Sequence, residues 1–159
     1  MGSKCKLIIC LSVLLAVVVV VAVIICVIIH TQNKDDYNAK LVSVMNEQNE
    51  TMVKNIFSFE FDRAYILNDC YISGEGFTQK YNLDISISEV KAGTSENIQR
   101  IVFVDNSGNF VYEFKCDNSE VLFSESGIII YPETKIKANS VAQEKPLEIS
   151  FQSVEHYDS

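Results

Sequence analysis

The sequence is poor in residues that enzymes commonly use for catalysis: among 159 residues it has two histidines and no tryptophan. His30 directly follows a long apolar run and His156 falls in a predicted C-terminal tail, so neither is placed for a Ser–His or Cys–His pair inside a folded domain. No histidines and cysteines have the spacing of zinc ligands. Gly74 and Gly76 lack the third glycine of a dinucleotide-binding loop. We therefore predict no catalytic, cofactor-binding or metal-binding residue, and a protein that is not an enzyme.

Carboxylates are the one type of catalytic group that the chain has in excess, with 21 Asp and Glu. Five of them crowd the first part of the predicted folded domain: Glu60, Asp62, Asp69, Glu75 and Asp84. A retaining glycosidase needs two carboxyl groups about 5 Å apart across a cleft. Such crowding is also typical of a solvated acidic surface. A small membrane-tethered enzyme that uses carboxylates, such as a glycan hydrolase, is therefore the alternative interpretation.

One long stretch contains no charge, proline or glycine: the 23 residues 7–29. With a rise of about 1.5 Å per residue, a helix of this length reaches roughly 35 Å and crosses a hydrocarbon core of about 30 Å. The alternative is a cleaved signal peptide, whose apolar region is shorter, about 7–15 residues. No small-x-small cleavage site follows Ile29. We therefore predict a transmembrane helix at 7–29 that binds the lipid bilayer.

The lysines around this run set the expected orientation. Lys4 and Lys6 stand close before it, whereas Lys34 and Lys40 lie farther away on the other side. Because positive residues near a membrane helix stay inside, this bias favours an internal N-terminus. We predict a single-pass, signal-anchored cell-membrane protein with a short cytoplasmic tail at 1–6 and an extracytoplasmic C-terminal part.

The part of the chain after the run is strongly acidic. It contains all 21 acidic residues and 11 of the 13 basic ones, which gives a formal charge of −10. Nucleic acids would be repelled by this charge, whereas cations or a basic protein would be attracted. We predict no nucleic-acid partner and expect an envelope or surface protein, or a polymer, as the partner.

Residues 30–56 are predicted to form a linker and an amphipathic helix that begins at Asp35 or Asp36 and ends near Asn55. Apolar residues recur there at helical spacing: Leu41, Val44, Met45, Met52, Val53 and Ile56. This stripe has two interpretations. It packs against the domain of its own chain, or it pairs with a second chain as a stalk, in which case a homodimer would form through the stalk or the membrane helix.

From residue 57 to 152 the pattern favours short strands. The clearest prediction is a hairpin of 98–104 and 110–116 joined by the turn Asp105–Asn109, which is rich in Asp, Asn and Gly. The other expected strands are 57–61, 64–72, 77–88, 121–123, 127–131, 134–137 and 147–151. A helical turn after Gly74 is the alternative for the first half of 77–88. We predict a β-rich α+β domain, an amphipathic helix followed by a mainly antiparallel sheet, with a β-sandwich as the alternative and a loose tail at 153–159.

Two of the five cysteines, Cys70 and Cys116, fall at predicted strand positions. In an oxidising compartment a disulfide between them would close a loop of about 46 residues and stabilise the domain by around 4 kcal/mol on the chain-entropy estimate. The alternative is two buried thiols that act as small apolar side chains.

The order of a membrane helix, an amphipathic helix and an antiparallel sheet is similar to the layout of type IV pilins. The chain lacks the Gly-Phe processing site before the apolar run, and Leu11 stands where that family has glutamate at the fifth position. We therefore do not assign the chain to that family. The sequence favours a single-pass membrane protein whose extracytoplasmic domain is a non-enzymatic binding or interaction module for an unknown ligand.

Overall fold

The structure is a computed structural model that describes residues 36–67, 69–139 and 146–157. The chain divides into two compact units, residues 1–36 and 37–159, and the fold described here is that of the second. The predicted tail at 1–6 and the predicted transmembrane helix at 7–29 lie outside the described residues. Within the described ranges, every helix is too short or too polar to cross a bilayer.

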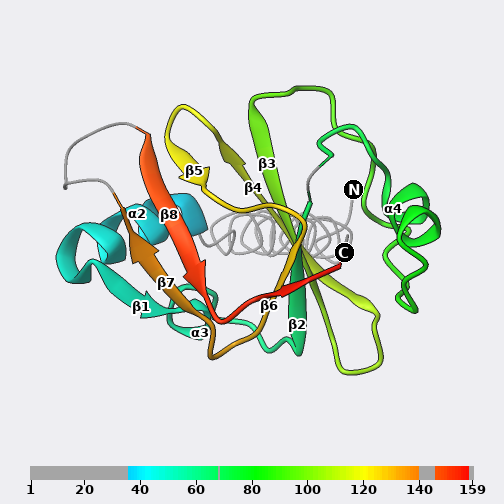
Figure 1. The fold of residues 1–159 in the computed structure, drawn as a ribbon, viewed down its shortest axis with the longest axis horizontal. Helices are drawn as coiled ribbons and strands as arrows, with labels where there is room; N and C mark the ends of the chain where they lie inside the picture. Colours follow the sequence, from blue (N-terminus) through cyan, green and yellow to red (C-terminus); the bar gives the residue numbers. More distant parts are fainter. Residues whose placement is uncertain (1–35, 68, 140–145, 158–159) are drawn as a thin grey trace, which may run out of the picture. The chain divides into compact units, whose positions relative to one another are not determined.

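Two β-sheets form the frame of the domain (Figure 1). The smaller has the order β1 (Glu50–Met52), β7 (Lys135–Ala138), β8 (Leu147–Gln152), β5 (Val121–Phe123). The larger has the order β4 (Phe110–Asp117), β3 (Ile98–Val104), β2 (Arg63–Leu67), β6 (Ile128–Ile130), β9 (Glu155–His156). Neighbouring strands pair antiparallel except β5 and β8, which run parallel. The predicted β-rich α+β class is confirmed, with two mostly antiparallel sheets in place of one.

Helix α2 (Tyr37–Gln48) contributes to the main core together with both sheets. Its residues Tyr37, Leu41 and Met45 are buried and belong to the same apolar cluster as Ile136 and Phe103 of the two sheets. These side chains therefore stabilise the domain of their own chain, which is the first of the two predicted uses of the stripe.

The predicted single helix from about 35 to 55 is wrong in its second half. Helix α2 ends at Gln48, and Asn49 adopts a positive φ of 57° that turns the chain away from the helix. The next residues form β1, in which Thr51 pairs with Ile136 of β7. The apolar stripe resumes in the short helix α3 (Val53–Ile56), whose Val53 and Ile56 are buried in the same core. Pairing with a distant strand outweighed the local helical pattern.

The predicted strand at 57–61 is also wrong, although its alternation has a structural meaning. The segment is in no ladder of either sheet. Its three phenylalanines instead surround Phe103, with ring centroids 4.6 Å (Phe57), 5.0 Å (Phe59) and 4.8 Å (Phe61) from that ring. The intervening Ser58 and Glu60 are exposed. The alternation thus separates buried and half-buried rings from exposed side chains without a neighbouring strand.

The predicted hairpin is confirmed. Strands β3 and β4 pair from Ile98↔Asp117 to Val104↔Phe110, with an irregularity between Phe103 and Val104. In the turn, the Asp105 carboxylate accepts hydrogen bonds from the main-chain N–H groups of Asn109 (2.8 Å) and Ser107 (2.9 Å). These bonds, first those from Asn109, lower the pKa of Asp105. Gly108 supplies the positive φ of 78° that the reversal requires.

Three other segments differ from the prediction because distant contacts decide them. Strand β2 ends at Leu67, and the expected strand at 77–88 contains helix α4 (Gly74–Lys80), which was the alternative, followed by a single bridge between Ser86 and Asn109. The expected loose tail is β9 at residues 155–156, and the Tyr157 hydroxyl donates to the Ile66 carbonyl at 2.8 Å.

Candidate functional site

The connection between β2 and β3 (residues 69–97) forms a second layer on the outer face of the larger sheet, which we call the α4 insert. Phe77, Ile87 and Val90 of the insert form an apolar cluster with residues on that sheet face: Tyr65, Leu67, Val102 and Val104. Helix α4 begins after Ser73, whose hydroxyl accepts a hydrogen bond from the Gly76 N–H at 3.2 Å. The insert therefore has its own small core and holds a defined conformation.

A buried arginine attaches the insert to the sheet. The Arg100 side chain in β3 is only 1% exposed. Its Nε donates to Glu113 Oε1 at 2.7 Å, and its Nη2 lies 2.6 Å from the same oxygen. Nη1 donates to the carbonyl oxygens of Cys70 (3.0 Å) and Ile72 (2.8 Å), and Nη2 donates to that of Lys91 (2.7 Å). Four hydrogen bonds and the ion pair with Glu113 thus compensate the burial of the guanidinium, as a buried cation requires.

Two of the carbonyl groups that Arg100 binds belong to the residues on either side of Tyr71. The N–H of Tyr71 donates to Asp69 Oδ1 at 3.0 Å. On the inner side, Gly93 packs so close that a Cβ at that position would overlap the Cys70 carbonyl oxygen. The main chain at Tyr71 is therefore held by three hydrogen bonds, one of its own N–H and two of its neighbours.

The Tyr71 ring projects from this fixed segment. It is 49% exposed and is the only large apolar side chain in the described ranges that is classed as exposed. The pKa of Tyr71 is raised, first by desolvation of the hydroxyl and then by the negative charge of Glu96 beside it. The sequence analysis did not single out Tyr71 or Arg100. The available signal was an arginine in a predicted strand, 98–104, that is otherwise mostly apolar, which indicates a buried and paired charge.

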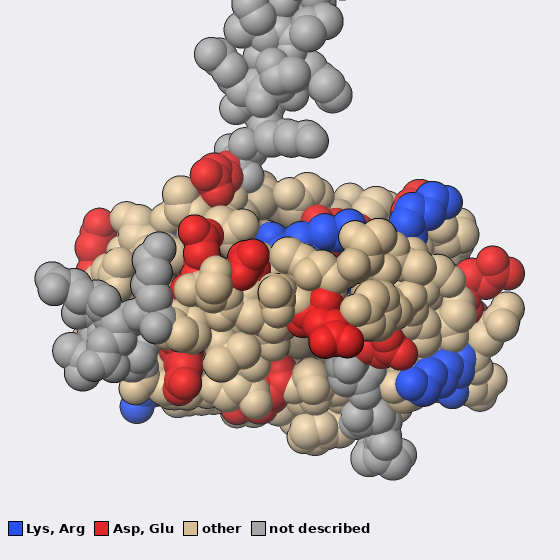
Figure 2. All heavy atoms as spheres, turned by 90° about the horizontal axis from the view of Figure 1, so that it is seen from above, with Lys and Arg blue, Asp and Glu red and all other residues tan. Residues whose placement is uncertain are grey.

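The surface around the insert is acidic. The insert contains five acidic residues and two lysines, Lys80 and Lys91, which gives a net charge of −3. Lys80 Nζ lies 3.9 Å from Asp69 Oδ2 and partly offsets that charge. Acidic side chains also predominate over basic ones on the whole of the face seen in Figure 2, with the basic ones gathered mainly toward its right-hand end. Cationic groups would therefore be attracted to this side of the domain.

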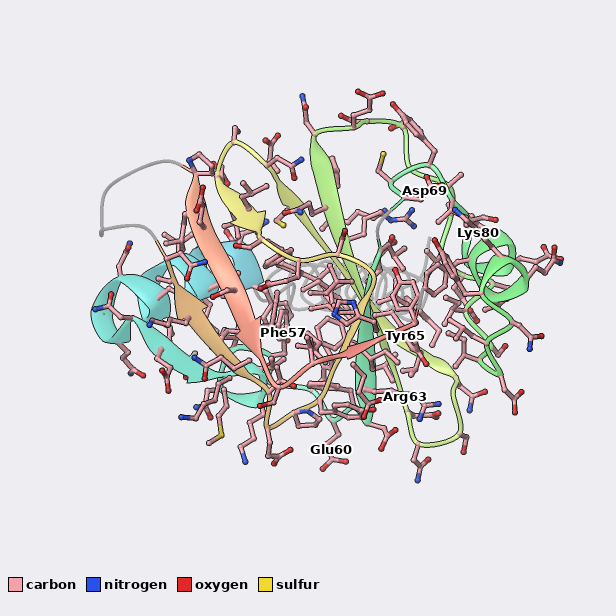
Figure 3. All side chains as sticks on the ribbon, viewed as in Figure 1. Phe57, Glu60, Arg63, Tyr65, Asp69 and Lys80 are labelled. Carbon is pink, nitrogen blue, oxygen red and sulfur yellow. The ribbon has the colours of Figure 1, made fainter. Side chains whose placement is uncertain are left out.

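The five carboxylates that were candidates for catalysis do not meet in a common pocket. Glu60, Glu75 and Asp84 are exposed to solvent. Asp62 is paired with Arg63 at 2.9 Å, and Asp69 is bound to the Tyr71 N–H. Figure 3 shows Asp69 in the upper part of the domain and Glu60 at its lower edge, so the two are far apart. Among the described residues, no group of three His, Cys, Asp or Glu is placed to hold a metal ion.

An apolar cavity of about 10 Å³ lies in the core between the two sheets. It is lined by Leu41, Val53, Phe57, Ile101, Phe123, Ile130, Ile136, Ile149 and Phe151. A buried water needs two to four polar partners, and these side chains offer none. The cavity is a small packing defect and has no room for a substrate.

The cysteines of the predicted disulfide are both free thiols in the structure. Cys116 is buried in the core between the sheets, where desolvation and then the charge of Asp117 raise the pKa of its thiol to about 12. The Cys70 carbonyl is bound by Arg100 on the opposite face of the larger sheet, and the Cys70 side chain is half-buried. The Cys70–Cys116 bond stays a prediction.

Thiol labelling distinguishes two free thiols at Cys70 and Cys116 from a disulfide between them. In the native protein at pH 8, we expect a maleimide to modify Cys70 and to spare Cys116, because Cys116 is buried and its pKa of about 12 leaves little thiolate at that pH. Both should react in denaturant. Peptide mapping by mass spectrometry reads out each site. Labelling of neither thiol in denaturant until a reductant is added would instead show the disulfide.

No protein family matches the chain, and comparison with curated proteins and with solved structures found no similar protein.

Proposed function

We propose that this chain is a single-pass membrane protein whose C-terminal domain is a non-enzymatic binding or interaction module on the extracytoplasmic side. The observation that carries the proposal is the 23-residue apolar run at 7–29, which in the sequence precedes a folded unit that begins at Tyr37. The main core of this unit is built from α2, α3 and both sheets. A domain with its own core is suited to present a surface to a partner while the run holds it at the membrane.

The partner surface is expected on the exposed loops of the domain. The apolar side chains of α2 are used in the domain core, so they are not available to a stalk partner. The α4 insert offers instead a rigid, acidic and exposed surface around Tyr71. The carboxylates of the alternative, a tethered glycan hydrolase, face solvent or pair with neighbouring groups. No described contact of theirs favours that alternative.

The orientation can be tested with an N-glycosylation acceptor that the chain already contains, Asn49-Glu50-Thr51. Asn49 is exposed in the turn between α2 and β1, 20 residues after Ile29. On translation of the full chain with endoplasmic-reticulum microsomes, we expect membrane integration that resists alkaline extraction and a mobility shift that endoglycosidase removes. Both results follow if positive residues keep the N-terminus outside the lumen.

Two variants make this experiment decisive. Asn49→Gln should abolish the shift without affecting membrane integration. Glu120→Thr creates a second acceptor at Asn118, in the turn before β5, and should add a second glycan. Absence of both glycans from an integrated chain would place the domain on the cytoplasmic side. Extraction of the chain by alkali would contradict the membrane anchor itself.

A further inference from the structure

The exposed ring of Tyr71 has the properties of a binding anchor. Tyrosine is among the residues that contribute most to protein–protein interfaces, since its ring offers a large contact area with few rotatable bonds. Tyr71 is 49% exposed and lies in the loop between β2 and α4. Its ring therefore adds contact area that the domain itself does not use.

The main chain that carries this ring is fixed before any partner arrives. Arg100 Nη1 binds the carbonyl groups on both sides of Tyr71, at 3.0 and 2.8 Å, and Asp69 binds its N–H. Burying a guanidinium has a desolvation cost that its hydrogen bonds only offset, so such a residue is a poor source of stability but an effective way to specify one conformation. Because the loop is already ordered, binding at Tyr71 loses less conformational entropy.

The charge beside the ring indicates the chemistry of the partner. The negative charge of Glu96 acts on the Tyr71 hydroxyl, and Lys80 partly offsets the other nearby carboxylate, that of Asp69. The insert as a whole has a net charge of −3. A guanidinium can stack on a tyrosine ring and at the same time form a bidentate ion pair with a carboxylate. An acidic or uncharged segment would gain only the contact with the ring.

From these observations we propose that Tyr71 and Glu96, which we call the Tyr71 surface, bind an arginine-containing basic segment of a partner protein. The arginine stacks on the Tyr71 ring and pairs with Glu96, and Arg100 acts from beneath as a positioning residue that holds the loop. This rests on the proposed function, a binding module, and names the class of its partner.

The test uses the full chain in nanodiscs of zwitterionic phosphatidylcholine, so that anionic lipid does not compete. The probe is a fluorescent peptide of four arginines separated by glycines, and binding is followed by anisotropy at low salt. We expect Tyr71→Ala and Glu96→Gln each to weaken the affinity about tenfold, while Tyr71→Phe, which keeps the ring, stays within twofold. Glu60→Gln is the matched control, since it removes an exposed carboxylate that lies far from Asp69, the residue whose carboxylate binds the Tyr71 N–H.

Equal losses for Glu96→Gln and Glu60→Gln would show diffuse attraction to an acidic domain and would overturn the proposal, as would full affinity in Tyr71→Ala. Absence of peptide binding together with a Tyr71-dependent dimer would assign the surface to a second copy of the chain and would also overturn it. Circular dichroism of each variant verifies that the domain is folded. Because this assay does not depend on the side of the membrane, its failure is distinguishable from a failure of the predicted orientation.

Discussion

Replacing Arg100 with methionine is expected to lower the free energy of unfolding by about 3–5 kcal/mol, the usual cost of removing one partner of a buried ion pair. The guanidinium is 1% exposed and Glu113 is 13% exposed, so the substitution leaves a carboxylate with little access to water. It also removes the hydrogen bonds to the carbonyl groups of Cys70, Ile72 and Lys91. We further expect amide hydrogen exchange to accelerate in the α4 insert, since Arg100 holds the insert to β3. Urea denaturation and exchange mass spectrometry measure the two effects.

Lys115→Met provides the matched control for this prediction. Lys115 pairs with the same Glu113, at 3.0 Å through Oε2, but its side chain is 50% exposed. Exposed ion pairs contribute little, so its loss should cost less than about 1 kcal/mol. If Arg100→Met and Lys115→Met lowered the free energy of unfolding by similar amounts, the loss would come from the charge of Glu113 and not from the buried hydrogen bonds of Arg100.

Truncation of Phe103 should have an effect of the same size. This side chain is fully buried in β3, and the rings of Phe57, Phe59 and Phe61 lie around it with centroids 4.6–5.0 Å away. Phe103→Ala removes the ring that the whole 57–61 segment packs against. We expect a loss of about 3–5 kcal/mol of unfolding free energy, from apolar burial and from the cavity that remains. The midpoint and slope of urea denaturation, followed by circular dichroism, measure it.

The control for Phe103→Ala is Tyr71→Ala, which removes an aromatic ring of similar size from an exposed position. This variant should keep the denaturation midpoint of the unaltered protein, because the structure places the Tyr71 ring at the surface. A large shift for Tyr71→Ala, or a small one for Phe103→Ala, would contradict the assignment of core and surface. The same variant serves the peptide-binding test, where a stable fold is required.

Local patterns predicted several elements, and most directly those whose neighbours are close in sequence. The β3–β4 hairpin is the clearest case, because Asp105 and Gly108 impose the reversal within five residues and the strands then pair next to each other. Strands β6, β7 and β8 also coincide within a residue or two with predicted segments. By contrast, the segment at 57–61 alternates like a strand but has no strand beside it, since nothing local specifies a neighbour. Periodicity indicates which side chains are buried and does not indicate what covers them.

The candidate surface needed information of another kind. Arg100 stands 30 positions from Cys70 and 28 from Ile72, so no local pattern connects the arginine with the carbonyl groups it holds. The sequence showed an acidic stretch, but neither the exposure of Tyr71 nor its position beside Glu96. Cys70 and Cys116 appeared equivalent as strand cysteines, whereas one is half-buried and the other has its thiol pKa raised to about 12 by burial.

The sequence by itself determined the properties that add up along the chain: the apolar run at 7–29 from which the membrane span is predicted, the charge of −10 after it, and the turn and the alternation that make the hairpin. Only the tertiary structure decided where α2 ends, that β1 pairs with β7, that β5 and β8 run parallel, and that residues 155–156 join the larger sheet. The reason is physical. Composition is a sum over the chain, and periodicity depends only on residues that are close in sequence. Hydrogen bonds between distant strands and the burial of Arg100 instead require long loops to close, and no single segment of the sequence specifies that closure.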